Sequence, residues 1–243
     1  MPELSIVIPA FNEERRLGKT LDILNAWISA QSFSVEVLVV DDGSRDATVK
    51  LVRDFIDAHP SFPLKLLQNP RNSGKGAAVR NGVLASTGDW VLFSDADLST
   101  PIEEYAKLRA AASKSGADLI IGSRAVDRSL VGKHQSFARE AAGRFFNLLM
   151  RSATGLNVQD TQCGFKLMRG PIGRRIFSVQ KLDGFSFDVE MLVIANQNAH
   201  AIAEVPVRWF NADDSKVTLA NGLRSFSDLL TIAANRRSGI YKL

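Results

Sequence analysis

The sequence predicts an α/β fold with a mostly parallel central sheet that carries helices on both faces. Two patterns support this prediction. Short, almost continuously apolar segments end in polar or glycine-rich residues, and they alternate with segments whose apolar residues recur at helical spacing. Such apolar runs are typical of parallel strands buried on both faces, and the amphipathic segments between them supply the crossover helices.

The first half of the chain shows this alternation most clearly. Its expected strands are residues 4–8, 35–40, 64–68, 90–94 and 118–122. Residues at helical spacing indicate two helices, one with Leu17, Leu21, Leu24 and Ile28 and one with Val49, Val52, Phe55 and Ile56. A small-residue helix is expected around residues 77–85. Residues 100–103 (TPIE) predict another helix start, with Thr100 as the N-cap and proline in the first turn.

The second half is less regular. Residues 139–153 form an amphipathic segment, residues 187–196 predict a helix, and residues 202–208 predict a strand. The C-terminal segment repeats apolar residues at helical spacing and ends in basic ones. No repeat, low-complexity tract or proline-rich linker divides the chain, so we expect one domain over residues 1–243.

Composition and charge narrow the classes of function. The formal net charge is +4, which is too mild to imply a nucleic-acid partner but suits an anionic substrate or a weakly anionic membrane surface. Cys163 is the one cysteine, so an intrachain disulfide cannot form and a reducing compartment is expected. No apolar run approaches the length that crosses a bilayer, and residues 1–30 do not resemble a signal peptide. A cytoplasmic location follows as the expectation, with any lipid reached from one side.

Polar clusters follow four of the expected strands. Ligands of parallel α/β sheets bind beyond the carboxyl ends of the strands, so these clusters are expected to form one rim. They are residues 9–14 (PAFNEE), 41–46 (DDGSRD), 69–76 (NPRNSGKG) and 95–97 (DAD). Together they offer carboxylates and amides for a base and ribose, a basic glycine loop for phosphate, and a carboxylate pair for a metal.

Asp95 and Asp97 are the candidate metal ligands. They lie two residues apart after a buried strand, and hard oxygen donors suit Mg²⁺ or Mn²⁺. A metal there neutralises charge on a leaving nucleoside diphosphate, which is the main demand of glycosyl transfer. The alternative is a solvated turn in which Asp97 only precedes a helix. The buried strand before the triplet and the three other polar clusters that follow strands favour the metal site.

The other two clusters leave alternatives open. Asp41 and Asp42 are adjacent, and like charges repel unless donors or a cation share them. We expect Asp46 to cap the next helix, while Asp41 or Asp42 accepts from a uracil N–H and ribose hydroxyls. Residues 74–76 (GKG) fit neither a P-loop nor a dinucleotide fingerprint. Lys75 or Arg71 near phosphate and a plain tight turn are equally supported by this motif alone.

In this order the clusters resemble the family 2 glycosyltransferases of the GT-A fold. Later stretches are similar to the dolichyl-phosphate sugar synthases: residues 122–124 (GSR), 160–166 (DTQCGFK), 187–190 (FDVE) and 215–216 (SK). The stretch 160–166 is more similar to the dolichyl-phosphate β-glucosyltransferases than to the mannosyl enzymes. The resemblance implies an inverting transfer of glucose from UDP-glucose to a polyprenyl phosphate, assisted by Mg²⁺ or Mn²⁺.

The resemblance also implies roles for particular residues. The donor set is Pro9, Ala10, Asn12, Glu13, Asp41, Asp42, Lys75, Asp95, Ala96 and Asp97, and the metal set is Asp95, Asp97 and Ser99. The acceptor set is Arg124, Arg139, Gln162 and Lys216, and the residues with catalytic roles are Asp95, Asp97, Arg124, Arg139 and Lys216. A phosphate monoester with a second pKa near ~6 is already anionic, so cations are needed more than a strong base. For Arg139 the alternative is a solvated helix face.

Two further pairs carry double interpretations. Asp160 and Lys166 form either a structural ion pair or, by the resemblance, the wall of the donor-sugar pocket. Asp188 and Glu190 are expected to start and support a helix rather than to contact sugar. The chain is expected to divide into a nucleotide-sugar half at 1–124, an acceptor half at 125–221 and an amphipathic basic tail at 222–243.

Departures from the mannosyl pattern favour the glucosyl assignment. Ser99 stands where mannosyl members carry glutamine, Gly143 replaces a serine, and residues 211–214 lack their arginine. Eukaryotic glucosyl members begin with a membrane-spanning helix that is not found here. Peripheral membrane contact is then expected through residues 139–153 and 222–237, although such stripes are more often core.

Rival functions differ in donor, acceptor or class. GDP-mannose or UDP-N-acetylglucosamine as the donor, or a soluble acceptor, keeps the same fold. A nucleotidyltransferase would need a glycine-rich loop directly after the first strand, where residues 9–13 (PAFNE) stand instead. A non-catalytic nucleotide-sugar sensor would bind the donor and tolerate loss of Asp97.

Overall fold

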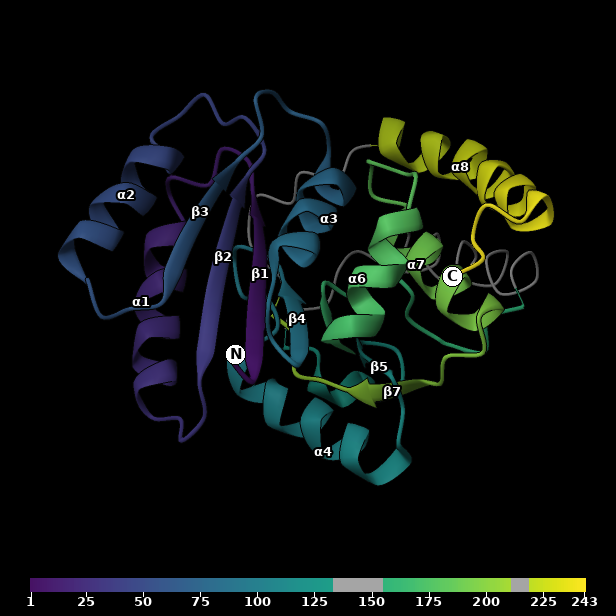
Figure 1. Cartoon of the computed structure of the whole chain (residues 1–243), viewed down its shortest axis with the longest axis horizontal. Helices are drawn as coiled ribbons and strands as arrows, with labels where there is room; N and C mark the ends of the chain where they lie inside the picture. The colour runs from purple at the N-terminus through teal and green to yellow at the C-terminus, as the bar shows by residue number, and fades with distance from the viewer. Residues whose placement is uncertain (133–154, 211–218) are drawn as a thin grey trace.

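The computed structural model describes residues 1–132, 155–210 and 219–243, with side chains of the last segment described from residue 227 (Figure 1). Seven strands form one sheet in the order β3-β2-β1-β4-β6-β5-β7. Strand β6 runs antiparallel to both of its neighbours, and the other pairs are parallel. The predicted mostly parallel sheet is therefore confirmed.

The elements lie close to their predicted positions. The strands are β1 Leu4–Ala10, β2 Val35–Asp41, β3 Leu64–Gln68, β4 Trp90–Ser94, β5 Leu119–Ser123, β6 Phe165–Arg169 and β7 Ile202–Pro206. The α-helices are α1 Leu17–Ser29, α2 Thr48–Ala58, α3 Lys75–Ala85, α4 Tyr105–Ser115, α6 Gly170–Val179, α7 Phe187–Gln197 and α8 Leu219–Ser238. Short 3₁₀ turns are η1 Ile102–Glu104 and η2 Arg128–Leu130. Strand β6 and helix α6 were not predicted, and residues 139–153 lie outside the described residues.

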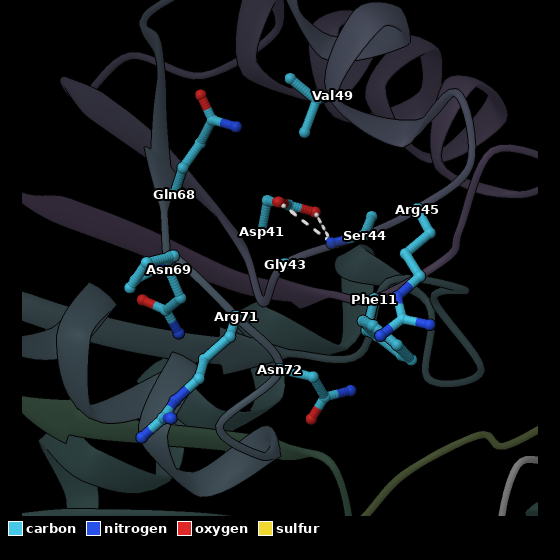
Figure 2. A pocket seen from close by; sticks show the side chains of 11 residues that line it. Phe11, Asp41, Gly43, Ser44, Arg45, Val49, Gln68, Asn69, Arg71 and Asn72 are labelled. Carbon is cyan, nitrogen blue, oxygen red and sulfur yellow. Dashed lines mark hydrogen bonds between the residues drawn. The ribbon is translucent and has the colours of Figure 1, made fainter.

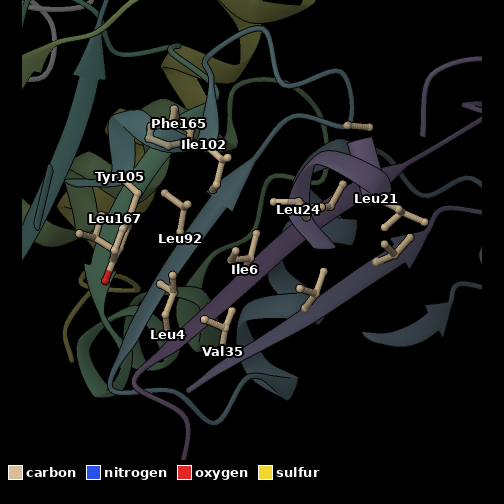
Figure 3. Close-up of a cluster of buried hydrophobic side chains, with 14 of the residues drawn as sticks. Leu4, Ile6, Leu21, Leu24, Val35, Leu92, Ile102, Tyr105, Phe165 and Leu167 are labelled. Carbon is tan, nitrogen blue, oxygen red and sulfur yellow. The ribbon is translucent and has the colours of Figure 1, made fainter. Parts of the chain in front are cut away.

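Two hydrophobic cores, one on each face of the sheet, hold the helices in place. Alternate residues of β1 show the division, because Ile6 and Ile8 pack with α1, α2 and α4, whereas Val7 packs with α3, α6 and α7. Figure 3 shows part of the first core, with Leu21 and Leu24 of α1 over the sheet. Each fully buried side chain of this size contributes roughly 1.5–3 kcal/mol to folding. The prediction of helices on both faces is confirmed.

The helix start predicted at Thr100 is wrong in its details. Pro101 is the N-cap residue of η1, with no side-chain cap hydrogen bond, and α4 begins only at Tyr105. Pro101 has φ −58° and ψ 143°, an extended conformation that proline adopts easily, so the helical turn begins one residue later than the capping pattern implies.

The sheet register brings the predicted polar clusters to one edge. Ala10 pairs with Asp41 on β2, and Val7 pairs with Phe93 on β4, so β1, β2 and β4 end at the same side. Neighbouring strands lie about 4.8 Å apart, which puts the ends of β2 and β4 about 10 Å from each other. The prediction that these strand ends form a common rim is confirmed. No helix among the described residues is long and apolar enough to span a membrane.

Candidate active site

A pocket of about 640 Å³ opens where β1, β2 and β3 end. Its lining residues are Phe11, Asp41, Gly43, Ser44, Arg45, Val49, Gln68, Asn69, Pro70, Arg71 and Asn72. Figure 2 shows the Asp41 carboxylate at this pocket, held by the backbone N–H of Ser44 at 3.2 Å, with Arg45 and Arg71 on opposite sides of the view. The size suits a small planar ligand, and Phe11 and Val49 supply apolar surface beside an acceptor carboxylate.

Asp42 has a different task from its neighbour Asp41. Its buried carboxylate accepts hydrogen bonds from Asn69 Nδ2 at 2.7 Å, from the backbone N–H of Ser73 at 3.0 Å and from that of Gly74 at 2.7 Å. These donors belong to the loop 69–74, so Asp42 fixes the shape of that loop. The repulsion between the adjacent carboxylates is relieved because each has its own donors. Of the two acceptors predicted for a nucleoside, Asp41 is therefore the one that lines the pocket.

The loop after β1 braces the loop after β2. Asn12 adopts φ 52°, accepts from the N–H of Arg45 at 2.9 Å and donates its own N–H to Ser44 Oγ at 2.8 Å. The N–H of Glu13 donates to Thr48 Oγ1 at 2.8 Å. Pro9 and Ala10 are the last residues of β1. None of these four predicted donor residues lines the pocket, which Phe11 reaches from the same loop, and the described contacts of Asn12 and Glu13 are structural.

Asp46 supports the start of α2 in a different way from the one predicted. Ala47 is the N-cap residue of that helix, with no side-chain cap bond. Asp46, one residue earlier, accepts from the N–H of Thr48 at 3.0 Å and so satisfies one of the free amides of the first turn. Burial would raise the pKa of Asp46, but these hydrogen bonds outweigh it and lower the pKa.

The acidic triplet stands at the end of β4, about two strands away from Asp41. Asp95 and Asp97 have side chains 35% and 19% exposed, respectively. Asp95 Oδ1 lies 2.6 Å from Lys75 Nζ, and Asp97 Oδ1 accepts from the N–H of Ser99 at 2.9 Å. The carbonyl of Ala96, buried between them, accepts from Thr20 Oγ1 at 2.6 Å. The backbone of the triplet is thus fixed while both carboxylates remain partly open.

Two cations contact this triplet: Arg16, which was not predicted as a site residue, and Lys75, which was predicted for the donor but not as a partner of Asp95. Arg16 Nη1 lies 3.4 Å from Asp97 Oδ2, while the rest of its guanidinium binds Glu13 at 2.8 Å. Arg16 was missed, although its spacing of three residues from Glu13 on a helix start was a usable signal. Lys75 was assigned to phosphate, and its ion pair with Asp95 was not foreseen.

The carboxylate oxygens that the acidic triplet offers fit a hard divalent cation. Within residues 1–132, 155–210 and 219–243 no group of three His, Cys, Asp or Glu side chains is arranged to hold a metal. Mg²⁺ does not require such a cage, because it usually binds through one or two carboxylates and completes its shell with water and substrate phosphates. Asp95 and Asp97 would hold the ion, with the half-buried Ser99 beside them. Bound there, it would supply positive charge for a diphosphate.

The glycine loop works through close packing. A Cβ on Gly74 or Gly76 would collide with the carbonyls of Asp183 or Leu182, so glycine lets the segment 182–184 dock on the start of α3. The Asp183 carbonyl accepts from the N–H of Gly76 at 2.7 Å. The first amides of α3 are therefore partly used inside the protein, while the Lys75 ammonium reaches the acidic triplet.

Arg124 follows β5 and is bound tightly by Asp160. Its Nε and Nη2 donate to the Asp160 carboxylate at 2.7 and 2.8 Å, and its guanidinium lies 5.5 Å from the centre of the Trp209 ring. Burial alone would lower the pKa of Arg124, but Asp160 outweighs it and the pKa is raised, so the arginine is fully charged. Strands β4 and β5 both run antiparallel to β6, so Asp95 and Arg124 follow strands that end at the same edge of the sheet.

The alternative of an Asp160–Lys166 ion pair is wrong. Asp160 binds Arg124, and Lys166 forms a buried ion pair with Asp188. The reason is the strand β6, in which successive side chains alternate: Phe165 packs on the α1 face, so Lys166 points to the face covered by α7. Asp188 and Glu190 lie in the first turn of α7, as expected.

The remaining predicted residues stand as follows. Gln162 lies half-buried in the segment before β6. Arg139 and Lys216 lie outside the described residues. Trp209 and Gly164 were missed, and a Cβ on Gly164 would collide with the Asp95 carboxylate. No sequence signal marked Trp209, whereas Gly164 stood inside the motif 160–166.

Comparison with known proteins places these features in a family. The family model described as glycosyl transferase family 2 matches residues 5–177. A dolichyl-phosphate beta-glucosyltransferase of Dictyostelium discoideum is 35% identical, with 99% of this chain and 76% of the relative aligned. Proteins of the same name from Drosophila melanogaster and Homo sapiens are 37% and 32% identical, over 89% and 99% of this chain and 69% and 78% of theirs.

Solved structures agree on the fold. Glucosyl-3-phosphoglycerate synthase from Mycobacterium tuberculosis, crystallised with Mn²⁺, UDP-glucose and phosphoglyceric acid, aligns with a TM-score of 0.66 at 19% identity. That alignment covers 97% of this chain and 79% of the other. S. aureus TarS 1–349 aligns with a TM-score of 0.64 at 19% identity, over 96% of this chain and 65% of that one. The predicted GT-A fold is confirmed.

Proposed function

This chain belongs to glycosyl transferase family 2, and we propose that it transfers glucose from UDP-glucose to a polyprenyl phosphate of the dolichyl type. The observation that carries the proposal is an identity of 32–37%, over 89–99% of this chain, to three proteins named dolichyl-phosphate beta-glucosyltransferase. The transfer inverts the sugar carbon and is assisted by Mg²⁺ or Mn²⁺. That the chain is a glycosyltransferase follows from the family itself.

The donor nucleoside occupies the pocket at the ends of β1 to β3. Uracil packs between the apolar surfaces of Phe11 and Val49 and donates its N–H to Asp41. The geometry that supports this role is that the Asp41 carboxylate lines the pocket, whereas the neighbouring Asp42 is taken up by the loop 69–74. The diphosphate then runs along the rim from Asp41 toward Asp95 and Asp97, in the half formed by residues 1–124.

The reaction is a direct displacement. An oxygen of the acceptor phosphate forms a bond to the anomeric carbon while the bond from that carbon to UDP breaks, and the electron pair leaves with UDP. The acceptor oxygen is already anionic near neutral pH because its second pKa is about 6, so no general base is needed. Asp95 and Asp97 would hold a divalent cation, which would supply positive charge to stabilise the departing diphosphate.

The acceptor phosphate is held by positive charge. Arg124 supplies a fixed guanidinium at the end of β5, where Asp160 and Trp209 orient it. Arg139, Gln162 and Lys216 complete the acceptor site in the half formed by residues 125–221. Arginine suits this task because its planar donors match phosphate oxygens and it stays charged.

The protein works as a cytoplasmic enzyme with peripheral membrane contact. Two observations on α8 support this part: Leu230 is 75% exposed, and Arg236 and Arg237 lie in the last turn. An exposed apolar side chain about two turns before basic ones on the same helix suits an anionic lipid surface. The amphipathic segment 139–153 is the second contact, with the lipid entering from one side.

Transfer assays test the proposal directly. The purified chain is incubated with labelled UDP-glucose, Mn²⁺ or Mg²⁺ and a polyprenyl phosphate in detergent, and label in the lipid phase is counted. We expect label to enter the lipid with UDP-glucose, with far less from GDP-mannose or UDP-N-acetylglucosamine. A soluble phosphate acceptor such as phosphoglyceric acid is the competing substrate. Folded protein that labels no lipid with either metal contradicts the proposal.

A further inference from the structure

The ammonium of Lys75 forms an ion pair with Asp95, one of the two carboxylates that would bind a metal. Lys75 is the first residue of α3, its side chain is 22% exposed, and its Nζ lies 2.6 Å from Asp95 Oδ1. Burial alone would lower the pKa of Lys75, but the charges of Asp95, Asp188 and Asp97 outweigh it and raise the pKa. The lysine is therefore a full cation, in direct contact with the Asp95 carboxylate.

The backbone that carries Lys75 is fixed on both sides. Gly74 and Gly76 flank it, and the segment 182–184 is packed so closely against both that neither can carry a side chain. The Asp183 carbonyl also accepts from the N–H of Gly76. Any movement of the ammonium must therefore come from rotation of its long side chain, which has four rotatable bonds.

Three other cations at these strand ends are bound to carboxylates of their own, whereas Arg45 and Arg71 line the pocket. Arg16 binds Glu13 through two nitrogens and reaches Asp97 only at 3.4 Å. Arg124 is held by Asp160, and Lys166 is buried against Asp188. Among the described residues, two cations contact predicted metal ligands, Arg16 at 3.4 Å from Asp97 and Lys75 at 2.6 Å from Asp95, and the Lys75 contact is the shorter.

We propose that Lys75 is a resident counter-cation of Asp95 that changes partner when the donor binds. Before the donor arrives, the ammonium neutralises Asp95. When Asp95 turns to a divalent cation, the ammonium moves to the oxygens of the donor diphosphate. The proposal rests on the proposed function, because it takes a nucleoside diphosphate as the ligand of this rim.

The physical reason is charge balance. An ammonium and a divalent cation on one carboxylate repel each other strongly at such short range, so without nucleotide they compete for Asp95. A diphosphate brings negative oxygens that accept the displaced ammonium and bind the metal as well, so with nucleotide the two cations act together. The protein alone then binds metal weakly, and metal and donor enter as a unit.

Lys75→Met separates this exchange from a merely structural role, because it removes the charge and keeps an unbranched side chain that is only one atom shorter. We expect Mn²⁺ to bind the nucleotide-free variant about tenfold more tightly, since Asp95 is released from its competitor. We expect UDP, measured in EDTA, to bind about tenfold more weakly, since the diphosphate loses a cation. Free Mn²⁺ is followed by electron paramagnetic resonance and UDP by titration calorimetry at one ionic strength.

Arg80→Met is the matched control on the same helix. Arg80 forms an ion pair with Asp183 at 2.7 Å and is 24% exposed, so its loss removes the same charge from a comparably buried position. Both affinities should stay within about twofold of the wild type, because salt screens the more distant charge. A thermal melt of each variant checks that it is folded.

Opposite shifts of the two affinities in Lys75→Met support the exchange. Weakening of both, an unchanged Mn²⁺ affinity, or an unchanged UDP affinity overturns it. The wild-type protein reports on the underlying function separately. If it binds UDP and Mn²⁺ and transfers glucose, a failure of the variant concerns Lys75 alone. If it binds neither, the proposed function has failed and the exchange with it.

Discussion

The two ends of the parallel part of the sheet carry carboxylates of opposite kinds. At the amino end, Glu36 is 5% exposed and accepts from Ser5 Oγ at 2.6 Å, the N–H of Thr87 at 2.6 Å and Lys65 Nζ at 3.0 Å. At the carboxyl end, Asp95 and Asp97 are 35% and 19% exposed. A carboxylate whose oxygens accept hydrogen bonds from the protein itself stabilises the fold. A carboxylate that stays partly exposed can bind a ligand.

The same contrast recurs inside the site. Asp41 and Asp42 are adjacent in sequence. The Asp42 carboxylate accepts its hydrogen bonds from the loop 69–74, whereas Asp41 faces the pocket. Residue type and position in the sequence do not separate these roles. The number of internal donors around each oxygen does.

Removing an open carboxylate should abolish turnover and spare the fold. We expect Asp97→Ala to lower kcat roughly 10²–10³-fold, because the cation at the diphosphate loses a ligand. Its melting temperature should stay close to that of the wild type, since Asp97 is partly exposed and has few internal partners. Label transfer to lipid is measured beside a thermal melt. A non-catalytic sensor would show no turnover to lose, and a variant that keeps it would refute the assigned role.

Much of this contrast was predictable from strand ends alone. The apolar runs before Asp41 and Asp95 marked two strand ends, and parallel strands must end at one edge. The strand β6 was not predictable in this way, because Lys166 interrupts its apolar run and its direction depends on β4 and β5, far away in sequence. The partners of Asp160 and Lys166 follow from that strand and were wrong for the same reason. The hydrogen bonds to Asp42 come largely from backbone amides of the loop, which every residue type except proline supplies, so no residue pattern marks them.

Removing the internally hydrogen-bonded carboxylate of Glu36 should have the opposite effect, lowering the stability of the fold and sparing turnover. Burial would raise the pKa of Glu36, but its bonds to Ser5, Thr87 and Lys65 outweigh it and lower the pKa from 4.5 to about 2. A lowered pKa stabilises the fold above the unfolded pKa of 4.5, and this stability is lost as pH falls toward 2. At neutral pH we expect Glu36→Gln to lose up to roughly 3 kcal/mol of unfolding free energy.

Urea unfolding across the pH range measures this loss. The difference between Glu36→Gln and the wild type should be constant from neutral pH down to about 5 and shrink below the unfolded pKa. Activity per folded molecule should not change, because Glu36 lies at the edge opposite the site. A difference that grows on acidification would contradict the assignment.

The smallest expected effects separate Asp41 from Asp42. We expect Asp41→Asn to weaken UDP binding about tenfold with little change in stability, because it faces the pocket. We expect Asp42→Asn to lower the unfolding free energy by about 1–3 kcal/mol, because charge-assisted bonds to Ser73 and Gly74 are lost. Calorimetry with UDP and a thermal melt on both variants form the comparison. Equal behaviour of the two would break it.

A crystal of the protein grown with UDP and Mn²⁺ tests the central claim most directly. We expect the uracil beside Asp41 in the pocket at the ends of β1 to β3, and an anomalous Mn²⁺ peak within about 2–2.5 Å of an oxygen of Asp95 or Asp97. The diphosphate should join the two. A nucleotide bound elsewhere, or a metal away from both carboxylates, would contradict the account.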